Sequence, residues 1–220
     1  MIDGCAPHRT TMITLYHCTD ARSFRALWAL HEIGLDYDLK MLPFPPRWHD
    51  KAYLAINPLG TIPFLTDGDT VMSESAAIVE YLIARHAPER LGVAVADAQY
   101  GAYCNWLHFG EATLTFPQTL VLRYTRLEPD RGLDGVAQDY ARWFHVRLRH
   151  VERALADGRA WLLGERFTGA DISVGYALLL ARNLKLDDGF EPLTSAYWQR
   201  LAARPAYLAA RAAQPKTREF

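Results

Sequence analysis

The hydrophobic pattern of the chain changes once, near Pro88, and this change limits the folds that the chain can adopt. Before it, apolar runs of strand length at 13–16, 37–41, 62–65 and 70–72 alternate with segments of helical period at 22–34 and 75–86. From Asp97 onward apolar residues recur only at helical spacing. We therefore predict an α/β domain over residues 12–88, a linker over 87–96 and an all-helical bundle domain over residues 97–220.

Turn and breaker residues support these boundaries. Gly34 follows the first helical segment, and Asp67-Gly68 is a hairpin signal between the last two strands. Pro43, Pro45 and Pro46 make the segment after the second strand irregular. The expected order is strand, helix, strand, irregular segment, two strands and helix.

Charge and composition exclude several kinds of partner. The chain has 24 basic and 25 acidic residues and a formal net charge of −1, which gives no electrostatic reason to expect nucleic acid or an anionic membrane. No apolar run approaches the roughly 20 residues that span a bilayer. Residues 1–11 lack the apolar region of a secretory signal and are expected to be a disordered or extended tail. The 3 cysteines form no CxxC pair, which favours a reducing, cytoplasmic location.

Three segments, taken together, carry a family resemblance. They are Asn57-Pro58-Leu59-Gly60-Thr61-Ile62-Pro63-Phe64-Leu65, then Ser73-Glu74-Ser75-Ala76-Ala77-Ile78, then Phe167-Thr168-Gly169-Ala170-Asp171-Ile172. With the α/β-then-α layout, they make the chain similar to the soluble, cytosolic-type glutathione S-transferases over about residues 12–214. The resemblance implies a thioredoxin-like N-terminal domain, a helical C-terminal domain and a homodimer.

The first two segments are expected to bind glutathione. In the resembled family the bond matching Ile62–Pro63 is cis, and the backbone matching Ile62 pairs with the cysteinyl part of the tripeptide, as an added strand would. The residues matching Glu74 and Ser75 hold the γ-glutamyl group. A helix start also suits a carboxylate on physical grounds, because its free N–H groups and dipole favour an anion. The alternative is that Pro63 shapes a loop and Ser75 is a plain N-cap.

The third segment has a structural interpretation. Thr168 and Asp171 have the spacing of a capping box, in which each side chain satisfies a backbone N–H at a helix start. We expect it to be a folding element.

A transferase must hold glutathione as its thiolate, because the thiolate is the nucleophile. The expected place is the segment from Tyr16 to Ser23, between the first strand and the first helix. Here the chain departs from the family, since the position of the usual catalytic Ser or Cys falls on Asp20 or Ala21. We therefore expect the thiolate to be stabilised by Thr19 or Ser23 with the helix amides, and next by Tyr16.

Other polar residues have open assignments. Cys18 could form a mixed disulfide with glutathione, although a lone cysteine that ends a strand is most often buried and inert. Arg25 is expected to support the first helix or the dimer. Thr61 takes the place of the residue beside the glycyl carboxylate, with His49, Lys51 and Arg47 as possible replacements; a solvated basic loop is the alternative.

The acceptor substrate is expected to meet the first long helix after the linker. Its aromatic stretch is more often core than pocket in proteins, but a helix in this place lines the acceptor pocket in the resembled family. The predicted pocket residues are Tyr103, Trp106, Gly110 and Thr113. The 8 histidines show no metal-binding spacing, so we predict no metal site.

The expected function is a glutathione transferase that activates glutathione, its co-substrate, as a thiolate for transfer to an apolar electrophilic small molecule in detoxification. A glutathione-dependent disulfide or peroxide reductase is the first alternative, and would use Cys18. A non-enzymatic binding module with the same fold is the second.

Overall fold

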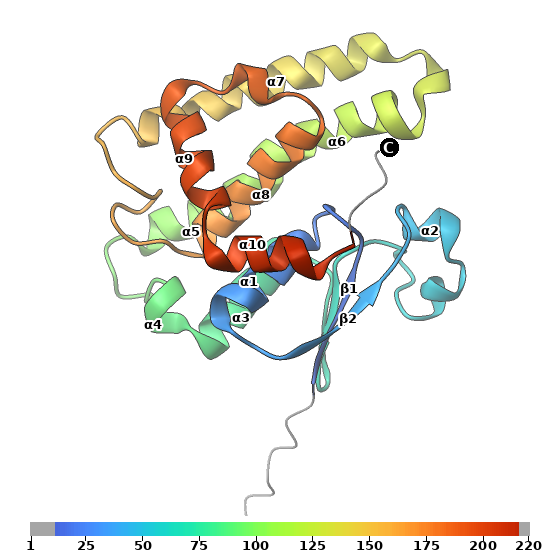
Figure 1. Cartoon of the computed structure of the whole chain (residues 1–220), viewed down its shortest axis with the longest axis horizontal. Coiled ribbons are helices and arrows are strands. Elements are labelled where there is room, and N and C mark those ends of the chain that lie inside the picture. The colour runs from blue at the N-terminus through green and yellow to red at the C-terminus, as the bar shows by residue number, and fades with distance from the viewer. Residues whose placement is uncertain (1–11, 216–220) are drawn as a thin grey trace, which may run out of the picture.

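The computed structural model describes residues 12–215 and has two layers, a small sheet with its helices and a larger group of helices (Figure 1). Residues 1–11, which we expected to be a tail, lie outside the described residues, as does Cys5. The fold class is thus the predicted one, a thioredoxin-like layer followed by helices.

The sheet has four strands in the order β2-β1-β3-β4. They are β1 (Ile13–His17), β2 (Tyr37–Met41), β3 (Phe64–Asp67) and β4 (Thr70–Met72). β1 runs parallel to β2 and antiparallel to β3, and β3 is antiparallel to β4. Leu15 and Leu65 face each other in the central pair and are fully buried, so alternation fixes which strand face meets the core.

Helices α1 (Phe24–Ile33) and α3 (Ser75–His86) pack together against the sheet. Their apolar stripes, which include Leu27, Leu30, Ile78 and Leu82, have no exposed surface. α1 ends where Gly34 takes φ +84°, and its N–H donates to the Leu30 carbonyl at 2.9 Å. Between β2 and β3 lie only two short helices, α2 (Pro46–His49) and η1 (Ala52–Ala55).

The chain from Pro88 onward is mainly helical. It contains α4 (Pro88–Leu91), α5 (Tyr100–His108), the π-helical η2 (Phe109–Thr115), α6 (Phe116–Leu122), the π-helical η3 (Arg123–Leu127), η4 (Pro129–Arg131), α7 (Asp134–Ala154), α8 (Gly169–Asn183), η5 (Asp187–Gly189), α9 (Pro192–Ala202) and α10 (Pro205–Ala213). α4 lies inside the expected linker, where Leu91 and Val93 are buried, so this connection is packed rather than loose.

α8 is the central helix, and every residue from Gly169 to Ala181 is buried. Small residues allow close approach of its neighbours. A Cβ on Gly175 would lie 2.8 Å from the Trp28 ring of α1, and one on Gly110 would lie 2.5 Å from Ser173 Oγ. α10 (Pro205–Ala213) returns to pack on α1 (Figure 1).

The predicted capping box at the start of α8 is confirmed. Thr168 Oγ1 accepts from the Ala170 N–H, and Asp171 Oδ2 accepts from the Thr168 N–H at 2.9 Å. The other Asp171 oxygen accepts from the Leu162 N–H and the Tyr197 hydroxyl, at 3.0 and 2.8 Å. This carboxylate therefore ties the loop before α8 to α9.

Candidate active site

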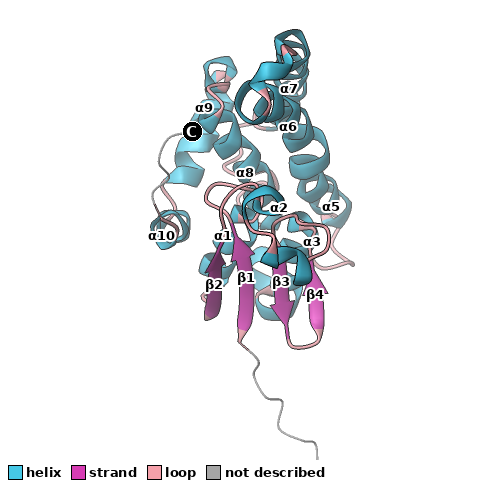
Figure 2. Ribbon diagram, turned by 90° about the vertical axis from the view of Figure 1, so that its right-hand side faces the viewer, coloured by secondary structure: helices cyan, strands magenta, loops and turns pink. Residues whose placement is uncertain are grey.

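The strand directions bring the sequence motifs to one edge of the sheet. Because β1 is parallel to β2, and β3 is antiparallel to β1 and to β4, the ends of β1, β2 and β4 and the start of β3 lie at the same edge. The segments that begin at Cys18, Leu42, Ile62 and Ser73 all meet there, and Figure 2 shows α2 at this end of the sheet. Segments that are far apart in the sequence are thus neighbours in the fold.

A cleft of about 810 Å³ opens between this edge and the helical layer. The sheet-side wall consists of residues 19–22, the loop around Thr61 and Ile62, and the start of α2. The opposite wall comes from α6, η3 and the end of α8. Of the predicted site residues, Thr19, Thr61 and Ile62 line this cleft.

The loop before β3 is held in shape by its own motif. Asn57 Nδ2 and the Tyr53 hydroxyl both donate to the Thr61 carbonyl, at 2.8 and 2.7 Å. Gly60 has φ +60°, and a Cβ there would lie 2.7 Å from Arg47 Cβ, so only glycine lets the loop meet α2. The Ile62–Pro63 bond is cis, as the resemblance implies.

The three candidate thiol-activating residues lie in different surroundings. Thr19 lies on the wall of the cleft. Ser23 is fully buried, and its hydroxyl accepts from the Cys18 N–H at 3.3 Å, so it braces the loop from within. The Tyr16 ring packs against Tyr53 and Phe64, with ring centroids 5.6 and 5.9 Å away. Thr19 is the one of the three that lines the cleft.

The Asp20 side chain points toward α10 and the residue that follows it. It has φ +54°, and its carboxylate binds Arg211, Gln214 (2.5 Å) and Asn183 (3.2 Å). Gln214 Oε1 accepts from the Asp20 N–H and bonds to His17 Nε2, at 3.2 and 2.9 Å. The negative charge of Asp20 is therefore neutralised by Arg211.

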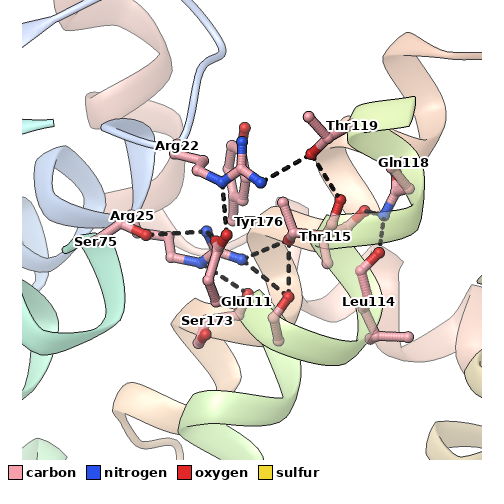
Figure 3. A network of polar contacts seen from close by, with 12 residues as sticks. Arg22, Arg25, Ser75, Glu111, Leu114, Thr115, Gln118, Thr119, Ser173 and Tyr176 are labelled. Carbon is pink, nitrogen blue, oxygen red and sulfur yellow. Dashed lines mark hydrogen bonds and ion pairs between the residues drawn. The ribbon is translucent and has the colours of Figure 1, made fainter. Parts of the chain in front are cut away.

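Two arginines, Arg22 just before α1 and Arg25 in its first turn, share one carboxylate (Figure 3). Arg22 Nε lies 2.6 Å from Glu111 Oε1, and Arg25 Nη1 lies 2.5 Å from Glu111 Oε2. Burial would raise the pKa of Glu111, but the guanidinium groups outweigh it and lower the pKa below its ordinary value. Arg22 also binds Thr119 at 2.8 Å and lines the cleft, so it presents a fixed cation beside Thr19.

Arg25, in contrast, is fully buried and joins the two layers. It donates to Ser75 Oγ, to Thr115 Oγ1 and to the carbonyls of Gly110 and Ser173 (Figure 3). The Gly110 carbonyl belongs to the π-helical turn η2, and it also accepts from the Thr115 hydroxyl at 2.7 Å. This matches the supporting role expected for Arg25 in the first helix.

Glu74 and Ser75 lie at the start of α3, at the same sheet edge, but are not among the residues that line the cleft. Glu74 is exposed, whereas Ser75 is 3% exposed and accepts from Arg25. His49, at the end of α2, is exposed and also outside the cleft lining, in which its neighbours Arg47 and Trp48 take part.

The four predicted acceptor residues do not line the cleft. Tyr103, Trp106 and Gly110 are buried where α5 and η2 pack on the helical core, and Trp106 stacks on His150 of α7 at 4.8 Å. Thr113 is partly exposed but is not part of the lining. Tyr103 and Trp106 therefore lie in the contact between helices, and their role toward an acceptor stays a prediction. On the helical side, the residues that line the cleft lie farther along the chain, between Thr119 and Glu128 and between Tyr176 and Lys185.

Cys18 is not placed for disulfide exchange. It is 1% exposed, and burial raises the pKa of its thiol to about 12, which keeps the thiol protonated at neutral pH. Within residues 12–215 no group of three or more His, Cys, Asp and Glu side chains could hold a metal ion. No helix in that range is long and apolar enough to cross a membrane.

The sheet, the helical layer and the cleft at the sheet edge define a thioredoxin-fold protein with a binding site between two layers. Family models match both parts: "Glutathione S-transferase, N-terminal domain" matches residues 21–85, and "Glutathione S-transferase, C-terminal domain" matches residues 147–211. The chain is 31% identical to glutathione S-transferase 3 of Zea mays, over 87% of this chain and 89% of that one. It is 29% identical to glutathione S-transferase GstA of Escherichia coli O157:H7, over 87% and 93%.

Solved structures agree. A glutathione transferase from Methylococcus capsulatus has a TM-score of 0.80 and 27% identity, with 92% of this chain and 98% of that one covered. A glutathione transferase from Phanerochaete chrysosporium in complex with oxidized glutathione has a TM-score of 0.80 and 25% identity, with 94% and 99% covered. The chain belongs to the glutathione S-transferase family.

Arg22 was missed by the sequence interpretation. Its partners Glu111 and Thr119 lie 89 and 97 residues away along the chain, so no local pattern marks it. The one available signal was its place beside the departure at Asp20-Ala21, just before the first helix.

Proposed function

We propose that this glutathione S-transferase binds glutathione at the sheet edge as its thiolate and transfers the sulfur to an apolar electrophilic carbon of a small molecule. The observation that carries the proposal is the cleft in which Thr19, Arg22 and Ile62 lie together. A hydroxyl and a fixed guanidinium group beside the expected position of the sulfur would favour its charged form.

Thr19 and Arg22 have different roles toward the thiolate in this proposal. The Thr19 hydroxyl donates to the thiolate, and Arg22 supplies positive charge from a position that Glu111 and Thr119 hold. The loop amides contribute less than expected, because the N–H groups of Cys18, Asp20 and Ala21 already donate to Ser23, Gln214 and the Cys18 carbonyl. Ser23 is then a positioning residue.

Glutathione itself would extend from this point along the sheet edge. Its cysteinyl backbone pairs with Ile62 after the cis bond to Pro63, and its γ-glutamyl group reaches Glu74 and Ser75 at the start of α3. Its glycyl carboxylate lies toward Thr61, with Arg47 as the nearest cation of the lining and His49 beyond it.

A direct test replaces Thr19 by valine, which keeps the shape and removes the hydroxyl. A hydrogen bond to a charged group contributes about 1.5–3 kcal/mol, so kcat/KM should fall by roughly 10- to 150-fold. Thr70→Val, in β4 and outside the cleft lining, is the matched control and should keep full activity. Unchanged kcat/KM in both Thr19→Val and Arg22→Gln would contradict the proposal.

A glutathione-dependent disulfide reductase is less well supported, because Cys18 is buried and its raised pKa disfavours the thiolate. Mass spectrometry after treatment with oxidised glutathione tests it, and a mixed disulfide at Cys18 would revive that alternative.

We also propose a cytoplasmic homodimer, as the family resemblance implies. On the helical layer Phe116 and Trp143 are exposed by 49% and 39% and lie on either side of Tyr140, which gives an apolar patch of the kind that a second subunit covers. Sedimentation at micromolar concentration tests this proposal, and a monomer would refute it.

A further inference from the structure

The helical wall of the cleft combines apolar side chains with cations. Leu122 of α6, Leu180 of α8 and Leu184, which follows α8, supply the apolar surface, and Arg123 and Lys185 lie next to them in the sequence and in the lining. A pocket for an uncharged apolar electrophile would need the leucines alone, because cations near an apolar ligand lose hydration without gaining a partner.

The acidic residues of the cleft do not cancel this charge. Asp20 is bound by Arg211 and Gln214, so its carboxylate is already neutralised. Glu128 lies 2.9 Å from Arg123 and 3.0 Å from Arg131, so one carboxylate serves two guanidinium groups.

Lys185 carries the clearest uncompensated charge on this wall. It follows the end of α8 in the left-handed conformation, with φ +58°, and its side chain is exposed at the rim of the cleft. Among residues 12–215, no carboxylate lies within ion-pair distance of its ammonium group.

The two carboxylates of bound glutathione would not pair with Arg123 and Lys185. In the proposed pose they lie along the sheet edge, toward Ser75 and toward Thr61 with Arg47, whereas Arg123 and Lys185 belong to the opposite wall. The surplus positive charge therefore faces the space left for the second substrate.

We propose that the acceptor substrate is an apolar organic anion, a carboxylate whose charge is bound by Lys185 and Arg123 while its body packs on the leucines. The inference rests on the proposed transferase function and adds the charge of the acceptor to it. Electrostatic attraction would also speed encounter with such a substrate, and this effect weakens as salt is added.

The test compares two acceptors of similar size and shape, one anionic and one neutral: 4-chloro-3-nitrobenzoate and 4-chloro-3-nitrobenzamide. In both, the glutathione thiolate forms a carbon–sulfur bond at C4, and chloride leaves with the electron pair of the broken carbon–chlorine bond. Each rate is divided by the uncatalysed rate with glutathione, so that intrinsic reactivity cancels. The benzoate should have the higher normalised kcat/KM.

Lys185→Gln and Arg123→Gln should each lower that preference by about three- to fivefold, the factor expected of a partly exposed ion pair. The normalised rate with the benzamide should fall less than that with the benzoate, and Lys185→Arg should restore the preference. Lys40→Gln, which removes an exposed charge paired with Asp38 on β2, is the control.

Two failures are distinguishable. Turnover of the benzamide at a rate equal to or above that of the benzoate would overturn the anionic acceptor and leave the transferase standing. Turnover of neither acceptor, together with no thiolate on bound glutathione, would overturn the transferase itself.

Discussion

The starts of α8 and α1 show two ways in which polar residues can begin a helix. At α8, Thr168 and Asp171 satisfy each other's backbone within four residues, and the site is completely buried. At α1, the residues before the helix are held by Glu111, Arg211 and Gln214, which lie far away in the sequence, and one side of the segment opens on a cleft. The first arrangement stabilises a fold, and the second leaves groups available for a ligand.

The largest effect is expected at the α8 start. Asp171→Ala leaves the Thr168 and Leu162 N–H groups and the Tyr197 hydroxyl without their acceptor, all of them buried. The free energy of unfolding should fall by about 3–5 kcal/mol. Urea denaturation measures this loss.

Asp187→Ala is the matched control, because its carboxylate pairs with exposed Arg182, and it should cost less than about 1 kcal/mol. Equal losses in the two variants would remove the distinction between a buried cap and a surface pair.

At the α1 start, Glu111→Gln should cost about 3 kcal/mol at pH 7, because it leaves the fully buried Arg25 without its counter-ion. The folded-state pKa of Glu111 lies below its ordinary value of 4.5. Its contribution is therefore present above about pH 4.5 and is lost as the pH falls through the lower folded-state value.

Chemical denaturation at several pH values checks both points. The wild-type protein should lose stability on acidification over this range more steeply than Glu111→Gln. Identical slopes would show that the carboxylate is not ionised by its arginine partners.

His17 gives a second pH dependence, in a different range. Burial is the main reason that its pKa falls from 6.5 to about 4, so the folded protein holds the imidazole neutral. The unfolded chain binds the proton more readily, and stability should fall by about 3 kcal/mol as the pH is lowered from about 6.5 to 4.

His17→Gln should flatten this part of the profile, and His86→Gln, an exposed residue at the end of α3, should leave it unchanged. A profile that is flat in the wild-type protein would contradict the neutral, buried His17.

The same contrast, between local contacts at the α8 start and distant contacts at the α1 start, explains what could be predicted from the sequence. Three elements, β2, β4 and α3, have the predicted bounds, and the capping box is found where it was expected, since their signals lie within a few residues of each other. β3 begins at Phe64, not Ile62, because Pro63 has no N–H to donate to the strand ladder.

The site was harder to predict. The turn of Asp20 toward Arg211, the place of Thr19 in the cleft lining and the fixed position of Arg22 depend on contacts between segments far apart in the sequence and between the two layers. The acceptor pocket was expected near Trp106, which packs against α7, whereas the helical wall of the cleft is formed by residues from Thr119 onward; which residues contact the acceptor stays a prediction.

The smallest stability effect is expected at the end of the chain. Gln214→Ala removes hydrogen bonds to His17 and Asp20 and should cost about 1 kcal/mol, while loosening the loop that carries Thr19. We expect kcat to fall with little change in the KM for glutathione. Gln199→Ala, exposed on α9, is the control. A change in stability without a change in kcat would show that the clamp on Asp20 does not position the site.

The most direct measurement is an ultraviolet difference titration of glutathione bound to the purified protein, with thiolate absorbance followed against pH. The account predicts ionisation well below the pH at which free glutathione ionises, about 8.5 for an ordinary thiol, and a shift back toward that value in Thr19→Val and Arg22→Gln. Bound glutathione that ionises as it does in free solution would contradict the claim that the α1 start activates the sulfur.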